Sequence, residues 1–209
     1  MEETAPRRRS KAERHEELLE AAVALAAEQG LDRLTVRDVA QRVGVTSGLF
    51  HHYFPSIDDL VIATFRRIAS ADLEWLHGGL AELPPTEALS TFLTRSVAPE
   101  RDPSLTVWLS GWLAASRRPG LRDAATELMG IGAAALAAIL RRGTDTGDFH
   151  CADPEASAQR IYVVADGFLI QRALNIGSVE RLGIESFLRK IVEDEIGAPL
   201  TQPAGRATE

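Results

Sequence analysis

Short polar side chains follow a glycine in the first quarter of the chain, where they could contact a nucleic acid. Thr46, Ser47 and Gly48 come just after Gly44, and His51 stands about one helical turn further on. Short side chains at the start of a helix let the helix lie deep in the major groove, and Gly48 lets its backbone come close to the DNA. The pattern predicts that Thr46, Ser47 and His51 contact phosphates and base edges.

A second pair of polar residues, Thr35 and Arg37, stands at the predicted start of the preceding helix. Backbone amides and the helix dipole favour a phosphate at this place. An arginine can also pair bidentately with guanine. We therefore expect both residues to contact DNA, and the basic run 7–11 to reach a neighbouring groove or the backbone as part of a flexible arm.

An aromatic group in the later part of the chain predicts a ligand pocket. Trp108 and Trp112 are four residues apart and share one face of a helix. Asp166 lies within the apolar run 161–170, where a buried carboxylate needs a partner. Core packing explains the aromatic residues equally well, and Asp166 is either a structural hydrogen-bonding group or a ligand contact. The candidate pocket residues are Phe65, Phe92, Trp108, Trp112, Asp166 and Phe168.

Other constellations carry little chemistry. His150, Cys151 and Asp153 could hold a metal ion, but one short cluster in a loop is a weak signal. Asp58 and Asp59 lack the spacing of a metal-binding diphosphate motif. The sequence contains no Ser-His-Asp order, phosphate loop or cofactor fingerprint. We therefore expect no enzyme activity, no catalytic residue, no metal and no cofactor.

Composition places the chain among ordinary globular proteins. It has 209 residues, 45% of them hydrophobic and 25% charged, with a formal net charge of −7. An acidic chain does not indicate nucleic-acid binding by its charge, so any DNA contact must come from a local basic surface. The lone cysteine, the lack of a secretory signal and apolar runs too short to span a bilayer predict a cytoplasmic protein without a membrane partner, associated with the nucleoid when bound to DNA.

Helical periodicity runs through almost the whole chain, and no strand alternation is sustained. Capping residues, prolines and glycines divide it into about nine helices. The predicted helices span residues 11–30, 36–43, 46–53, 57–80, 86–97, 104–116, 121–142, 154–175 and 179–196. We expect an all-α protein with a flexible basic arm (1–10), a three-helix helix-turn-helix DNA-binding head (11–56), a ligand-binding and dimerisation bundle (57–198) and a disordered tail (199–209).

Two short helices around Gly44 are typical of a helix-turn-helix, although such a pair can also serve packing alone. The segments RHEELLEAA (14–22), LTVRDVA (34–40) and GVTSGLFHHYF (44–54) closely resemble the N-terminal domain of the TetR/AcrR family. The resemblance covers about residues 11–66 and implies a dimeric, usually repressing, DNA-binding regulator. It implies DNA contacts by Thr35, Arg37, Thr46, Ser47, Gly48, Leu49, His51 and His52, and we add Ser56 at the start of the next helix.

Two positions depart from that resemblance. The family usually has tyrosine where this chain has His51, and lysine where it has Ile57. Because that lysine commonly reaches a phosphate, its loss predicts weaker backbone binding or compensation by the basic run 7–11.

The body resembles the BetI-like branch of C-terminal domains through WLSGW (108–112), RPGLR (118–122), GDF (147–149), DPE (153–155) and ADGF (165–168). Gly111 stands where that branch often has an aromatic residue, which would enlarge or reshape the site. Gly167 permits close helix approach, and with the last helix it predicts a homodimer through helices 154–175 and 179–196.

These features predict a repressor that a small-molecule effector releases from a palindromic operator in double-stranded DNA. The alternative is a helical small-molecule-binding or scaffold protein whose head has lost DNA binding. The acidic charge and Ile57 favour this alternative, and binding to the DNA that flanks the protein's own gene distinguishes the two.

Overall fold

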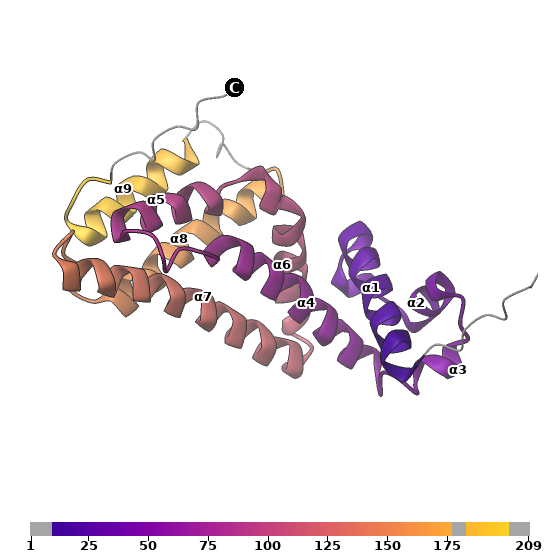
Figure 1. The fold of residues 1–209 in the computed structure, drawn as a ribbon. Helices are drawn as coiled ribbons and strands as arrows, with labels where there is room; N and C mark the ends of the chain where they lie inside the picture. Colours follow the sequence, from indigo (N-terminus) through magenta and orange to yellow (C-terminus); the bar gives the residue numbers. More distant parts are fainter. Residues whose placement is uncertain (1–9, 177–182, 201–209) are drawn as a thin grey trace, which may run out of the picture.

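The structure is a computed structural model that describes residues 10–176 and 183–200. The described residues form nine α-helices and two 3-10 turns, and they contain no strand, which confirms the predicted all-α class. Figure 1 shows α1–α3 as a head at one end of α4, with the other helices forming a body. The helices are α1 (Lys11–Gln29), α2 (Val36–Val43), α3 (Ser47–Phe50), α4 (Ile57–His77), α5 (Pro85–Ser96), α6 (Asp102–Ala115), α7 (Pro119–Thr146), α8 (Pro154–Ala173) and α9 (Ile184–Ile196), and the 3-10 turns are η1 (Leu31–Arg33) and η2 (Pro99–Arg101).

Local capping signals fix most helix starts. Ser10 caps α1 through a capping box with Glu13, so the predicted arm is too long by this residue, which belongs to the folded head. The side chains of Thr35, Thr46 and Ser56 cap α2, α3 and α4 as predicted. Arg7–Arg9 of the predicted arm lie outside the described residues.

Most helix limits differ from the predicted ones by a few residues. The recognition helix α3 ends at Phe50 rather than at residue 53. Helix α7 runs through the start of a predicted loop to Thr146. Within it Gly143 packs directly against Phe149, where a Cβ would lie 2.0 Å from the ring. Helix α9 begins at Ile184, and residues 177–182 of the predicted break and helix start lie outside the described residues.

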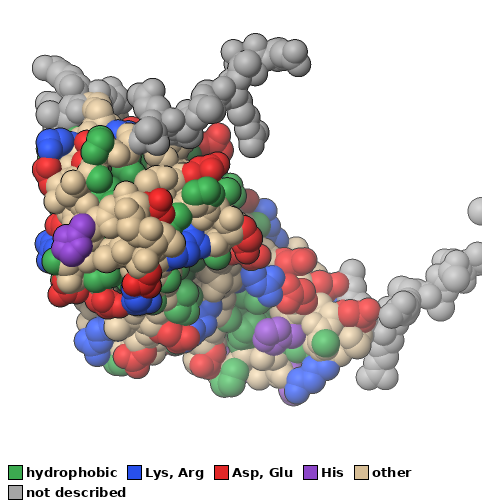
Figure 2. Space-filling model, turned by 60° about the vertical axis from the view of Figure 1, so that its left-hand side comes forward, with side chains coloured by type: hydrophobic (Ala, Val, Ile, Leu, Met, Phe, Trp, Pro, Cys, Tyr) green, Lys and Arg blue, Asp and Glu red, His purple; other side chains and the backbone are tan. Residues whose placement is uncertain are grey.

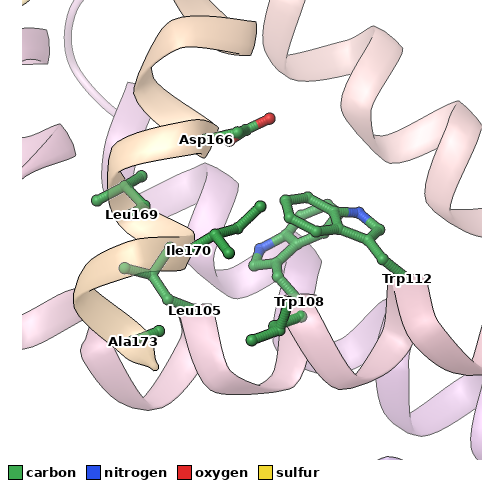
Figure 3. Close-up of a pocket in the computed structure, with 8 residues that line it drawn as sticks. Leu105, Trp108, Trp112, Asp166, Leu169, Ile170 and Ala173 are labelled. Carbon is green, nitrogen blue, oxygen red and sulfur yellow. The ribbon is translucent and has the colours of Figure 1, made fainter. Parts of the chain in front are cut away.

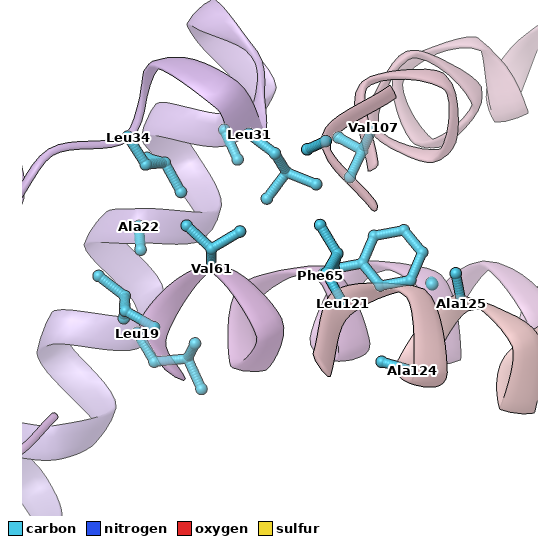
Figure 4. Packing of buried hydrophobic residues seen from close by; sticks show 14 of the residues in the cluster. Leu19, Ala22, Leu31, Leu34, Val61, Phe65, Val107, Leu121, Ala124 and Ala125 are labelled. Atoms are coloured by element: carbon cyan, nitrogen blue, oxygen red, sulfur yellow. The ribbon is translucent and has the colours of Figure 1, made fainter. Parts of the chain in front are cut away.

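One apolar core joins the head to the body (Figure 4). Leu19 and Ala22 of α1 and Leu31 of η1 pack with Val61 of α4 and Val107 of α6 in one buried cluster. A shared core makes the head and the body a coupled unit, because displacing α4 or α6 disturbs contacts in both.

A second core cluster lies within the body, where α5 and α9 pack with parts of α4, α7 and α8. Leu200 belongs to this cluster, and its backbone N–H donates to Glu193. The predicted disordered tail is therefore wrong for Leu200, whereas residues 201–209 lie outside the described residues.

Helix α7 is, within the described residues, long and apolar enough to cross a membrane by length and composition alone. Half of its most apolar 18-residue window is buried inside the body. A helix buried in the core of a soluble protein can be equally long and apolar, so the length and composition of α7 are only weak support for membrane insertion.

Candidate nucleic-acid interface and ligand cavity

A tight turn sets the angle between α2 and α3. Gly44 ends α2 in the left-handed region at φ 73°, and the next amide, of Val45, donates to Ala40 O at 2.9 Å. This conformation favours glycine because it has no Cβ. Below the turn, Ala40 and Phe50 are buried, so α3 is held against α2 by packing as well as by the turn.

The outer side of α3 is open to solvent. Thr46, Ser47, Gly48, His51 and His52 are exposed, and a Cβ added at Gly48 would meet no atom within 4 Å. Leu49, which we also predicted as a contact, is half-buried. This surface of short side chains can approach a nucleic acid closely without steric obstruction from its own chain.

Two predicted contacts are occupied by capping. Thr35 Oγ1 accepts a hydrogen bond from Asp38 N at 3.2 Å and donates to its carboxylate at 2.7 Å. Ser56 Oγ makes the same pair of bonds with Asp59, at 3.1 and 2.7 Å. Each hydroxyl therefore already donates its only proton and accepts one hydrogen bond. One oxygen lone pair and the nearby backbone amides are left for any further contact.

Two arginines of the head, and one of α4 beside it, are neutralised by carboxylates. Arg42 pairs with Glu28 and Arg14 with Glu17 within the head, and Arg67 of α4 pairs with Glu16. The hydrogen bonds from Arg42 lower the pKa of Glu28. Figure 2 shows basic and acidic side chains interspersed over the face that it draws.

Three cations of the head remain available. Lys11, Arg33 and Arg37 are exposed and have no carboxylate partner among the described residues. Of these, Arg37 stands in the first turn of α2, close in sequence to the Thr35 cap. The basic surface of the head is therefore small and local.

Both departures from the family pattern have a structural account. Ile57 packs partly buried against the core that joins head and body, so its side chain serves packing. His51 is exposed at the end of α3, with its ring edge-on to Phe50 at 5.4 Å between centroids.

A cavity lies between α6 and α8 in the body (Figure 3). It consists of two adjoining spaces of about 10 and 30 Å³, which share four lining residues. This volume holds one or two waters, so the cavity is too small for a larger ligand as it stands. The shared residues are Leu105, Trp108, Trp112 and Asp166.

Predicted and observed pocket residues overlap in three positions. Trp108, Trp112 and Asp166 line the cavity as expected. Phe65 packs edge-on behind Trp108 at 5.1 Å, Phe92 packs against His77 and Tyr162, and Phe168 packs against Phe187 of α9. These three phenylalanines therefore build the surrounding cores rather than the cavity wall.

A buried ion pair that was not predicted from the sequence borders the cavity. Arg101 donates from Nε and Nη2 to the two carboxylate oxygens of Asp72, at 2.9 and 2.7 Å. Trp108 Nε1 donates to the same carboxylate at 3.0 Å, and Arg101 Nη1 donates to Ser96 O at 3.2 Å. The network fixes the orientation of Trp108. Asp72 within the apolar stretch of α4 was the available sequence signal.

Asp166 has no such partner. No hydrogen bond or ion pair joins its side chain to any other described residue, although it lines the cavity. Burial raises its pKa from the usual 3.8 to about 6, and the nearby charge of Arg101 lowers it only in part. An unpaired carboxylate at this depth destabilises the folded chain while it is ionised.

Replacing Asp166 by asparagine is therefore expected to raise the free energy of unfolding at pH 7.5. The raised pKa corresponds to an effect of about 1–3 kcal/mol. Because the folded-state pKa lies above the unfolded one, the gain should shrink as the pH falls from 7 towards 4. Urea unfolding at pH 7.5 and at pH 4 measures the change in the free energy of unfolding for the wild type, Asp166→Asn and the exposed-site control Asp123→Asn. A destabilised Asp166→Asn would indicate a structural hydrogen bond instead.

The helix that carries the tryptophans also contacts the head. Leu31 N of η1 is 3.5 Å from Ser110 Oγ of α6, and Val107 of α6 is buried with Leu31. Gly111 allows close packing, since a Cβ there would lie 2.6 Å from the Phe65 ring. The Phe65 ring from α4 therefore fills the space that a side chain at position 111 would take. Gly111 does not enlarge the cavity, contrary to the prediction from the sequence.

Two family profiles match the chain. Residues 18–64 match the bacterial regulatory proteins of the tetR family, and residues 85–197 match the C-terminal part of the BetI-type transcriptional repressors. The second match covers more than half of the chain.

Individual proteins agree with these profiles. The KstR2 repressors of Mycolicibacterium smegmatis and Mycobacterium tuberculosis are 36% and 43% identical over 75 residues, which is 36% of this chain and about a third of each relative. BetI of Burkholderia thailandensis is 30% identical over 52% of this chain and 58% of its own length. A solved transcriptional regulator from Saccharomonospora viridis, in complex with choline, has the same fold, with a TM-score of 0.75 at 24% identity over 88% of this chain and 98% of its own.

Proposed function

The chain belongs to the TetR family of bacterial regulatory proteins, and its C-terminal part is of the BetI type; we propose that it represses transcription from an operator in double-stranded DNA and leaves it when a small molecule binds the body. The observation that carries this proposal is the open surface of α3 together with the exposed Arg37 of α2, which has no carboxylate partner among the described residues. Such a repressor acts in the cytoplasm, on the nucleoid.

The operator is proposed to be a palindrome read by a homodimer. Outward apolar residues on α8 and α9 support an interface there: Val163 and Phe187 are exposed, and Gly167 has open space where a side chain would stand. Each head then meets one half-site, with the two recognition helices about 34–36 Å apart, or somewhat more when no ligand is bound.

Release follows from the small volume of the cavity. A ligand larger than water fits only when α6 and α8 separate, so it binds an altered state more tightly than the state described here. Because α6 contacts η1 of the head, and α4 joins the same core, this displacement changes the positions of the heads. A coupling of about 1–3 kcal/mol is expected.

Arg37→Ala is expected to weaken specific operator binding by about 1–3 kcal/mol, because the arginine reads a base edge or neutralises a phosphate. Fluorescence anisotropy with a duplex from the region flanking the protein's own gene measures the change. Arg122→Ala, an exposed arginine on α7, is the matched control. Unchanged affinity and specificity would remove Arg37 from the interface.

The scaffold alternative has one supporting observation, the neutralisation of Arg14, Arg42 and Arg67 by carboxylates. It predicts no preference for any duplex at physiological salt, with ligand binding in the body retained. The same anisotropy titration, together with a calorimetric ligand titration, separates the two functions.

A further inference from the structure

We infer that His51 contacts a DNA phosphate in its protonated form, so that operator binding takes up a proton and strengthens as the pH falls. The inference rests on the proposed function, because it concerns how the head binds DNA. What it adds is the proton, which makes the DNA affinity of the head respond to pH.

His51 lies on the side of α3 that is open to solvent. It stands four residues after Ser47, and residues at this spacing share a helix face. The backbone at His51 is still helical, with φ −66° and ψ −10°, so the turn continues through this residue although α3 ends at Phe50. The imidazole is exposed, and its ring lies edge-on to the buried Phe50 ring. It therefore stands on the same side of the head as the short side chains that let DNA approach.

Permanent positive charge is missing from this part of the head. Between Gly44 and Ile57, the only side chains that can become cations are His51 and His52. Ile57 packs partly buried against the core, and the first turn of α4 carries Asp58 and Asp59. Two carboxylates at this place repel a phosphate. A positive charge for the DNA backbone along this stretch must therefore come from a protonated histidine.

The charged groups of the neighbouring elements leave His51 free to do this. No ion pair or hydrogen bond joins its side chain to a carboxylate of the described residues. On α1, His15 stacks on Phe54 with 4.4 Å between ring centroids, and on α2 the exposed Arg37 is a like charge. The carboxylates of α2 and α4 already accept hydrogen bonds from other groups: Asp38 from Thr35, Asp58 from Arg118 and Asp59 from Ser56.

A DNA phosphate changes the charge of a histidine beside it. Histidine is the side chain that ordinarily changes charge near neutral pH, with a typical pKa of about 6.5. A phosphate within about 4–6 Å stabilises the protonated ring, which donates from both nitrogens, whereas the neutral ring donates from one. The contribution of this contact to affinity is therefore complete at acidic pH and is lost as the pH rises above neutrality.

An anisotropy titration of the full chain with the duplex that flanks the protein's own gene tests the inference at pH 6.0 and pH 8.0. If the phosphate favours protonation about tenfold, the affinity should be about five- to tenfold higher at pH 6.0. The slope of log affinity against log salt concentration should also be steeper at pH 6.0, by nearly one, because one more phosphate is neutralised. An affinity and a slope that do not change with pH would overturn the proposal.

Variants assign the effect to His51. His51→Gln should bind equally at both pH values, and His51→Lys, with its permanent charge, should bind at pH 8.0 as tightly as the wild type does at pH 6.0. His52→Gln is the matched neighbour and should keep the pH dependence. Asp166→Asn should also keep it, although it removes a carboxyl group of the body whose pKa of about 6 lies in the same range. A pH dependence that survives in His51→Gln, or that only His52→Gln removes, would contradict the role of His51.

Circular dichroism and light scattering at both pH values verify that each variant has the fold and the oligomeric state of the wild type. A scrambled duplex separates this inference from the proposed function. Because a phosphate contact does not depend on sequence, the pH dependence should appear with both duplexes. Equal binding of the two duplexes would contradict the proposed function alone, and a sequence preference without pH dependence would contradict this inference alone. Absence of binding to either duplex at pH 6.0 would contradict both.

Discussion

Replacing Asp72 by alanine is expected to lower the free energy of unfolding by about 3–5 kcal/mol, because it leaves the buried charge of Arg101 uncompensated. Both partners are almost fully buried, with side-chain exposures of 8% for Arg101 and 2% for Asp72. The change also removes the acceptor of Trp108 Nε1, which would become a buried unpaired donor. Urea unfolding followed by circular dichroism measures the loss.

The matched control is Glu127→Ala, which breaks the exposed pair with Arg66 and should leave the unfolding midpoint nearly unchanged. Asp72→Asn should fall between the wild type and Asp72→Ala, because the amide keeps one acceptor but no charge. If Asp72→Ala unfolds at the wild-type urea concentration, the network is not a stability determinant of the body.

Replacing Gly48 by leucine is expected to reduce operator affinity by about 100-fold, equivalent to about 2.7 kcal/mol. A leucine side chain would project from the open surface of α3 and keep the helix from lying deep in the groove. In the free protein its Cβ would meet no atom within 4 Å, and leucine favours a helix more than glycine does. Operator anisotropy titration, with thermal unfolding of the same sample, measures both properties.

Gly48→Ala adds one methyl group and should show a much smaller loss of affinity. A leucine variant that binds the operator as tightly as the wild type would show that α3 does not approach the DNA closely. A variant that loses both binding and its unfolding transition would indicate instead that Gly48 supports the fold.

The head could be predicted from the sequence because its signals are local. Thr35, Thr46 and Ser56 each cap the helix that follows within three residues, and Gly44 marks the turn where a positive φ is required. The length of α3 was overestimated, since helical propensity alone does not reveal that the chain leaves the helix after Phe50.

The cavity was predictable only in part, because its residues come together through tertiary packing. Trp108 and Trp112 share a helix face, which is a local property. Whether a phenylalanine such as Phe92 or Phe168 faces the cavity or a core depends on the rotation of helices distant in sequence. Arg101 was missed for the same reason, since it reaches Asp72 across 29 positions of the chain.

The position of α6 explains how the two parts can act together. Trp108 and Trp112 border the cavity, while Val107 and Ser110 of the same helix contact η1 of the head. Ion pairs from Arg118 to Asp58 and from Arg66 to Glu127 tie α4 to the start of α7 and to α7 itself. A displacement of α6 therefore reaches the head directly as well as through α4.

The most direct test of the central proposal is an anisotropy titration of the wild type, Arg37→Ala and Gly48→Leu against the duplex that flanks the protein's own gene. A scrambled duplex of the same composition is the reference. We expect one saturable dimer per palindromic site, an affinity that falls with salt concentration, and loss of the preference in both variants. Equal binding of the native and scrambled duplexes by the folded wild type would contradict a sequence-specific DNA-binding function.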